Sequence, residues 1–133
     1  MSKLVVIIQC EQVQKRCSGY NCTHAFYTRD GKFADYPEDT HYMSFTCGGC
    51  CGAGLTVKLE NLKKRLRRFQ EDGQEVIIHL SSCMVSDNYH KPPCPHLEYI
   101  ISLLEKKGFT VVKGTYISKT ASKKREAGIY KSF

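Results

Sequence analysis

The chain has 133 residues, among them eight cysteines and five histidines, and a formal net charge of +7 at pH 7. A chain of this length buries an ordinary hydrophobic core without disulfides to compensate for a missing one. No stretch approaches the roughly 20 apolar residues of a membrane-spanning helix, and the apolar run over residues 4–8 is too short for a signal peptide. We therefore expect a cytoplasmic protein whose thiols are reduced, metal-bound or catalytic.

Four segments are predicted to be strands: residues 4–8, 42–46, 75–80 and 109–116. The first and third are continuous apolar runs, which are typical of strands buried on both faces. Between them, residues 18–30 predict a short helix and residues 31–40 an irregular connection.

Two longer helices are predicted from apolar residues at spacings of three and four. The first has the stripe Leu55, Leu59, Leu62, Leu66 and Phe69, and Asp72-Gly73 ends it. The second opens at Pro95 as a first-turn proline, and its buried face consists of Leu97, Ile100, Ile101 and Leu104.

The alternation of strands and helices predicts a single three-layer α/β domain over residues 1–118, of the flavodoxin or Rossmann type. Its central parallel sheet has about four strands, with helices on both faces. Residues 119–133, rich in lysine and serine, form a basic tail that we expect to be loosely ordered.

Three cysteines follow three of the predicted strands: Cys10, Cys47 and Cys83. Because the carboxyl ends of parallel strands share one edge of a sheet, where open α/β sheets bind ligands, these thiols are predicted to meet in one site.

Other cysteines and histidines have the spacing of metal ligands. Cys47-Gly-Gly-Cys50 lets two thiolates reach one tetrahedral ion, and the glycines permit the tight loop. Cys94-Pro-His96 adds a thiol and an imidazole at the start of a helix. A third cluster, Cys17, Cys22 and His24, completes the same site or forms a second one. His79 lies within a strand, so we interpret it as a hydrogen-bonded core histidine.

Several alternatives compete with a metal site. Cys47 and Cys50 could form a redox dithiol, activated by the helix that follows. The segment from Cys10 to Arg16 fits the C-x5-R pattern of phosphatases, but it lacks the small residues of a phosphate-binding loop. The glycines of residues 48–54 match neither phosphate-binding fingerprint. The basic residues between Lys58 and Arg68 are interpreted as a solvated helix face rather than a nucleic-acid site, because no aromatic residues interleave with them.

Five motifs of the chain together resemble the CGGC domain family. They are Cys10, the segment from Cys17 to Cys22, Cys47-Gly-Gly-Cys50, the segment from His79 to Cys83 and Cys94-Pro-His96. The resemblance covers nearly the whole chain and implies a metal-binding domain, with zinc as the expected ion and no established reaction. Members commonly have Gly-Thr-His after the last strand, whereas this chain has Gly114-Thr115-Tyr116. If that histidine is a ligand elsewhere, it is lacking here, and Cys51 is the candidate replacement.

The sequence therefore predicts a metal site, with zinc or alternatively an iron–sulfur cluster, since both use soft thiolate ligands. The predicted ligands are Cys10, Cys47, Cys50, Cys83 and Cys94, with His96 as an auxiliary ligand. Cys17, Cys22 and His24 are secondary candidates. The sequence does not reveal a substrate, a partner or an oligomeric state.

Overall fold

The computed structural model describes residues 3–10, 17–47, 53–70, 73–85 and 95–115, with the side chains of Ala53 and Cys83 left out. Its centre is a four-stranded sheet in the order β2-β1-β3-β4, and all neighbouring pairs are parallel. The strands are β1 (Lys3–Gln9), β2 (His41–Thr46), β3 (Glu75–Leu80) and β4 (Thr110–Lys113). The predicted α/β class with a parallel sheet is confirmed.

β1 lies at the centre of the sheet and supplies side chains to both faces. Val5 and Ile7 pack on one side, and Leu4, Val6 and Ile8 on the other. Successive side chains of a strand point to opposite faces, so an unbroken apolar run fits a strand covered on both sides. The predicted burial of this run is confirmed.

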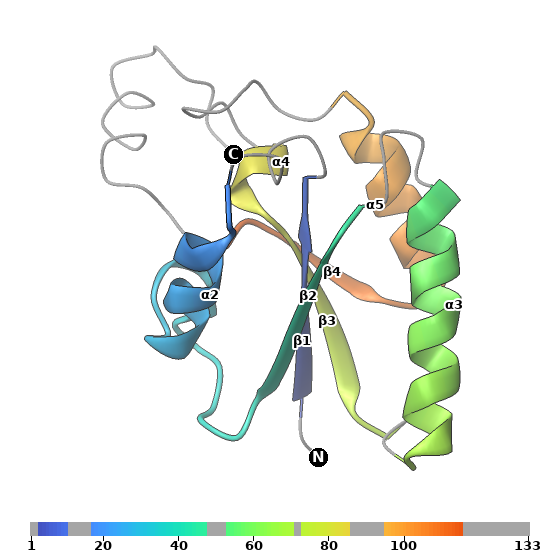
Figure 1. Ribbon diagram of the computed structural model, residues 1–133, viewed down its shortest axis with the longest axis horizontal. Helices are drawn as coiled ribbons and strands as arrows, with labels where there is room; N and C mark the ends of the chain where they lie inside the picture. The colour runs from blue at the N-terminus through green and yellow to red at the C-terminus, as the bar shows by residue number, and fades with distance from the viewer. Residues whose placement is uncertain (1–2, 11–16, 48–52, 71–72, 86–94, 116–133) are drawn as a thin grey trace.

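Helices cover both faces of the sheet (Figure 1). On one face lie α2 (Tyr20–Tyr27) and the short 3-10 helix η1 (Gly31–Phe33). On the other lie α3 (Ala53–Arg68) and α5 (Leu97–Lys106). The four-residue helix α4 (Ser82–Val85) begins one residue after the end of β3 and was not predicted. At 16 residues, α3 is longer than the other described helices. Among the described residues, no helix is long and apolar enough to cross a membrane.

The direction in which successive strands are added to the sheet reverses between β1 and β3. From β1 it crosses by way of α2 to β2 at one edge, and from β3 it crosses by way of α5 to β4 at the other. The covering helices lie on opposite faces, as right-handed crossovers in opposite directions require. In such sheets, ligands bind beyond the carboxyl ends of the two strands at the reversal. Those strands are β1 and β3.

Three sequence predictions differ from the structure in detail. α3 ends at Arg68, before Asp72-Gly73, because the chain turns into the left-handed conformation at Gln70, where φ is 59°. Phe69 therefore lies beyond the end of the helix and is 68% exposed, so its predicted place in the apolar stripe is wrong. α5 begins at Leu97, with Pro95 in the preceding turn, and β4 ends at Lys113.

Candidate functional site

Cys10 and Cys47 lie side by side at the carboxyl edge of the sheet. Gln9 pairs with Thr46 at the ends of β1 and β2, and the next residue of each strand is a cysteine. The backbone N–H of Cys47 donates to the Gln9 carbonyl at 3.0 Å, so the pairing of β1 with β2 continues as far as Cys47. Both thiols belong to the core cluster on the α3 and α5 face, where they are 6% and 5% exposed. The structure thus places both cysteines just past adjoining strand ends, and their role as ligands stays a prediction.

The end of β3 joins this edge through its backbone. The Ser81 N–H donates to the Ile8 carbonyl at 2.9 Å, and α4 begins at the next residue. Cys83 is the second residue of α4, three residues beyond the end of β3, and its side chain is among those the structure leaves out. The sequence interpretation put Cys83 just past the strand, and α4 keeps its backbone at the carboxyl edge.

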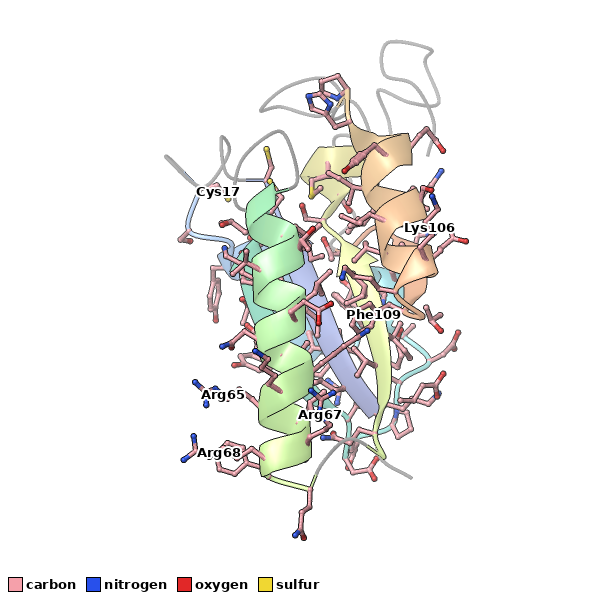
Figure 2. The ribbon with its side chains drawn as sticks, turned by 90° about the vertical axis from the view of Figure 1, so that its right-hand side faces the viewer. Cys17, Arg65, Arg67, Arg68, Lys106 and Phe109 are labelled. Carbon is pink, nitrogen blue, oxygen red and sulfur yellow. The ribbon has the colours of Figure 1, made fainter. Side chains whose placement is uncertain are left out.

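Cys17 packs against the same core cluster as Cys10 and Cys47. Its Sγ accepts a hydrogen bond from the Gly19 N–H at 3.4 Å. Gly19 has φ 82°, a left-handed conformation that glycine adopts without strain, and it is the N-cap of α2. The hydrogen bond holds the Cys17 side chain beside the start of α2. Figure 2 shows Cys17 near the carboxyl end of the sheet.

The remaining secondary candidates belong to α2. Cys22 packs against the cluster on the α2 face, and its Sγ lies 3.1 Å from Thr115 Oγ1. His24 is exposed, and its ring centroid lies 5.8 Å from that of Tyr20. Cys22 thus approaches the carboxyl edge from the face of the sheet opposite to Cys10 and Cys47.

Among the other predicted ligands, His96 is exposed at the N-cap of α5 and makes no side-chain capping bond. Cys50 and Cys94 lie outside the described residues, as does Cys51. Within the described part of the chain, no three Cys, His, Asp or Glu side chains form a group that could hold a metal ion.

A lysine adds positive charge beside the thiol pair. Lys58 Nζ, on the second turn of α3, donates to the carbonyl and the hydroxyl oxygen of Thr46, both at 3.1 Å. The ammonium group is thus anchored one residue from Cys47. A cation at this position offsets part of the negative charge that a cluster of thiolates would carry.

The other end of α3 is also basic but lies far from the thiols. Arg65, Arg67 and Arg68 lie near the amino edge of the sheet, whereas Cys17 lies at the opposite end of the molecule (Figure 2). Lys63 Nζ donates to the Lys107 carbonyl at 3.1 Å and lies 5.1 Å from the centroid of the Phe109 ring. The basic end of α3 therefore takes no part in the candidate site.

Comparison with known proteins extends the motif-based resemblance. The CGGC domain family matches residues 4–116, which is most of the 133-residue chain. The chain belongs to the CGGC domain family. An uncharacterized protein of Methanocaldococcus jannaschii is 30% identical over 121 residues, which cover 84% of this chain and 85% of that protein. No solved structure shows a significant match.

A buried polar network, which sequence reasoning only partly predicted, supports the carboxyl edge of this CGGC domain. His79 is fully buried, and its Nδ1 lies 2.8 Å from the Gly114 carbonyl oxygen. Since a carbonyl only accepts, Nδ1 carries the proton, and Nε2 accepts from the Tyr36 hydroxyl at 2.6 Å. The interpretation of His79 as a hydrogen-bonded core histidine is confirmed.

The protonation states in this network follow from burial. Burial lowers the pKa of His79, the hydrogen bond to Gly114 opposes this, and the charge of Lys32 lowers it further. Burial, together with the charge of Glu75, raises the pKa of Tyr36 to about 12. The neutral imidazole and the phenol hydroxyl are therefore the forms present near neutral pH. The sequence contained no signal for Tyr36, because 43 residues separate it from His79.

Proposed function

We propose that this CGGC domain binds a metal ion, zinc, through thiolates at the carboxyl edge of its sheet. The candidate ligands are Cys10, Cys47, Cys50, Cys83 and Cys94, with His96 as an auxiliary ligand. The observation that carries the proposal is the position of Cys10 and Cys47 on adjoining strand ends, in one core cluster.

The spacing of the two strands fits a shared ion. Adjacent strands of a sheet lie about 4.8 Å apart. In a tetrahedral zinc site with Zn–S bonds of about 2.3 Å, neighbouring sulfurs are roughly 3.8 Å apart. Two thiols on the same face of adjoining strand ends are therefore close enough to bind one ion with small side-chain rotations.

Cysteine-rich sites of this kind bind zinc or iron–sulfur clusters, and the ligand chemistry is shared. We favour zinc because several thiolates with an imidazole are the ligand chemistry of tetrahedral zinc sites. A bound zinc ion would join the ends of β1 and β2 to the segments that follow them. With a fourth position open, the ion would also act as a Lewis acid.

The first test is the metal content of the chain purified without oxygen. We expect about one zinc per chain and no visible colour. Iron with acid-labile sulfide and a brown chromophore would instead assign an iron–sulfur cluster. If no metal copurifies and all eight thiols react freely, the metal proposal fails, and a redox dithiol of Cys47 and Cys50 becomes the better interpretation.

Single variants then test the thiol pair. We expect Cys10→Ala and Cys47→Ala each to lose most of the bound zinc, because each removes a ligand while leaving a small apolar side chain in the core. The matched control is His41→Ala, at the exposed start of β2 on the opposite edge of the sheet, which should retain the metal. Full zinc content in folded Cys10→Ala and Cys47→Ala protein, checked by circular dichroism, would contradict the assignment.

A further inference from the structure

The positive charge of the chain is concentrated on α3. This helix of 16 residues holds six of the 20 lysine and arginine residues and one of the 13 aspartate and glutamate residues. Five of the six form the basic end of α3: Lys63, Lys64, Arg65, Arg67 and Arg68. All but Lys63 are exposed, and no ion pair or side-chain hydrogen bond joins Arg65 or Arg67 to another described residue. These two guanidinium groups are therefore available to a ligand.

Helix stability alone does not account for this arrangement. Basic residues are favourable near the carboxyl end of a helix, but the effect falls off within the last turn, which Lys63 and Lys64 precede. Like charges four residues apart destabilise a helix, and this segment has two such pairs, Lys63 with Arg67 and Lys64 with Arg68. Binding of an anion offsets that repulsion.

A pocket of about 380 Å³ lies beside the basic end of α3. Lys63 and Arg67 line it from the helix, and Phe109 lines it from the turn between α5 and β4. Lys63 Nζ lies 5.1 Å from the centroid of the Phe109 ring and donates to the Lys107 carbonyl, so the ammonium group is held at this pocket. Glu75 also lines the pocket, and its carboxylate disfavours an anion inside. A phosphate is therefore expected at the rim, where Arg67 is exposed.

Phe69 sets an exposed aromatic ring beside these cations. It is 68% exposed, whereas the other described phenylalanines are buried or partly buried. Its backbone N–H donates to the Arg65 carbonyl at 3.1 Å, which holds it against the last turn of α3. The Arg68 guanidinium lies 5.8 Å from the centroid of its ring. A phenyl ring has no polar group to face water, so a flat apolar partner would stabilise it here.

We propose that the basic end of α3, with the ring of Phe69, binds single-stranded nucleic acid. Proteins that bind single strands without sequence preference combine basic side chains along the phosphates with aromatic rings on which bases stack. The bases of a duplex stack on one another and present no face to such a ring, and an acidic protein segment would leave the ring unused. The proposal is independent of the metal site, because Arg65, Arg67 and Arg68 lie at the opposite end of the molecule from Cys17 (Figure 2).

The test is the fluorescence anisotropy of a labelled single-stranded DNA of about 20 nucleotides, which is longer than the roughly 4–16 nucleotides that one single-strand-binding OB-fold covers. We expect binding whose log K falls linearly with log salt, by about 0.7 for each phosphate contacted. The double variant Arg65→Gln/Arg67→Gln should weaken binding and lower that slope by about 1.4. Phe69→Ala should weaken binding about 5- to 100-fold and leave the slope unchanged.

A matched control removes the same charge elsewhere. Lys32→Gln/Lys113→Gln neutralises two exposed lysines outside α3 and should bind as the wild type does. Equal weakening of this control and of Arg65→Gln/Arg67→Gln would show that only the net charge matters, which overturns the assignment of the surface. Urea denaturation checks that each variant is folded, and Phe69→Leu, which removes the ring but keeps an apolar side chain, replaces Phe69→Ala if that variant is not.

The choice of ligand is tested with two further probes. A duplex of the same sequence should bind more weakly than the single strand, and poly-glutamate at equal charge should displace the DNA poorly. No binding of the single strand at low salt, or unchanged binding by folded Phe69→Ala, would overturn the proposal. A duplex that binds as tightly, or poly-glutamate that competes as well as unlabelled DNA, would do so too and would indicate a general site for polyanions.

Discussion

The two faces of the sheet are stabilised in different ways. The α3 and α5 face is aliphatic, with Leu55, Leu59, Ile100 and Leu104 packed on β1 and β3. The α2 face is smaller and aromatic. Phe26 stacks on Tyr42 with ring centroids 4.9 Å apart, and the ring centroids of Phe33 and His79 are 4.6 Å apart. Arg29 adds hydrogen bonds to the carbonyls of Tyr36 and Pro37, at 3.3 and 3.0 Å.

The candidate cysteines are held in place differently on the two faces. Cys10 and Cys47 depend on apolar burial, which needs only side chains of about the right size. Cys22 depends on hydrogen bonds with specific donors and acceptors, which few substitutions preserve. We therefore expect substitutions on the aliphatic face to change stability most, and those on the aromatic face to change the geometry of the carboxyl edge.

The largest effect is expected from Leu59→Ala on the aliphatic face. Leu59 is fully buried, so its truncation leaves a cavity and should lower the free energy of unfolding by about 2–5 kcal/mol. Urea denaturation followed by circular dichroism measures the change. The matched control is Val57→Ala on the same helix, where the side chain is 69% exposed and the change should be small. Equal effects of the two variants would show that this face is not the main apolar core.

A smaller loss is expected from Tyr36→Phe on the aromatic face. The variant leaves His79 Nε2 without its hydroxyl donor, and an unsatisfied buried acceptor costs about 1–3 kcal/mol. We expect the lower part of that range, because Tyr36 is only half-buried and water can reach the gap. Tyr27→Phe, in an exposed tyrosine of α2, is the control that should leave urea denaturation unchanged. A neutral Tyr36→Phe would mean that the hydroxyl does not support His79.

The smallest effect is a dependence on pH. Because the pKa of His79 is lowered in the folded chain, the unfolded chain takes up this proton at a higher pH. The free energy of unfolding should therefore fall as the pH drops below about 6.5, the ordinary histidine value. The decrease between about pH 7.5 and 5.5, measured in a metal chelator, should be smaller in His79→Gln. His41→Gln, at an exposed histidine, should keep the wild-type slope, and an unchanged slope in His79→Gln would contradict the prediction.

Much of the fold could be predicted because the spacing of apolar residues in the sequence indicates the strands and helices. The apolar runs of β1 and β3 and the leucine spacing of α3 report burial directly, since side-chain periodicity follows backbone geometry. Phe69 shows the limit of this reasoning. Its spacing continued the stripe, but the turn at Gln70 removed it from the helix, and a pattern of apolar residues does not locate such a turn.

The candidate site was predictable to the extent that topology alone decides it. Once the sheet is parallel, cysteines that follow its strands must come to one edge, and Cys10 and Cys47 do so. The contact between Thr115 and Cys22 was not predictable, because 93 residues separate them and neither belongs to a periodic pattern. The predicted ligands Cys50 and Cys94 lie outside the described residues and stay predictions.

The sequence by itself determined the order of strands and helices, the parallel sheet and the edge at which thiols follow strands, because each depends on local periodicity and chain connectivity. Only the tertiary structure decided which thiol faces which side of the sheet and which polar groups hold it. Hydrogen bonds such as those of Thr115 and His79 join residues brought together by the packing of the whole chain. No local pattern records which donors and acceptors will meet there.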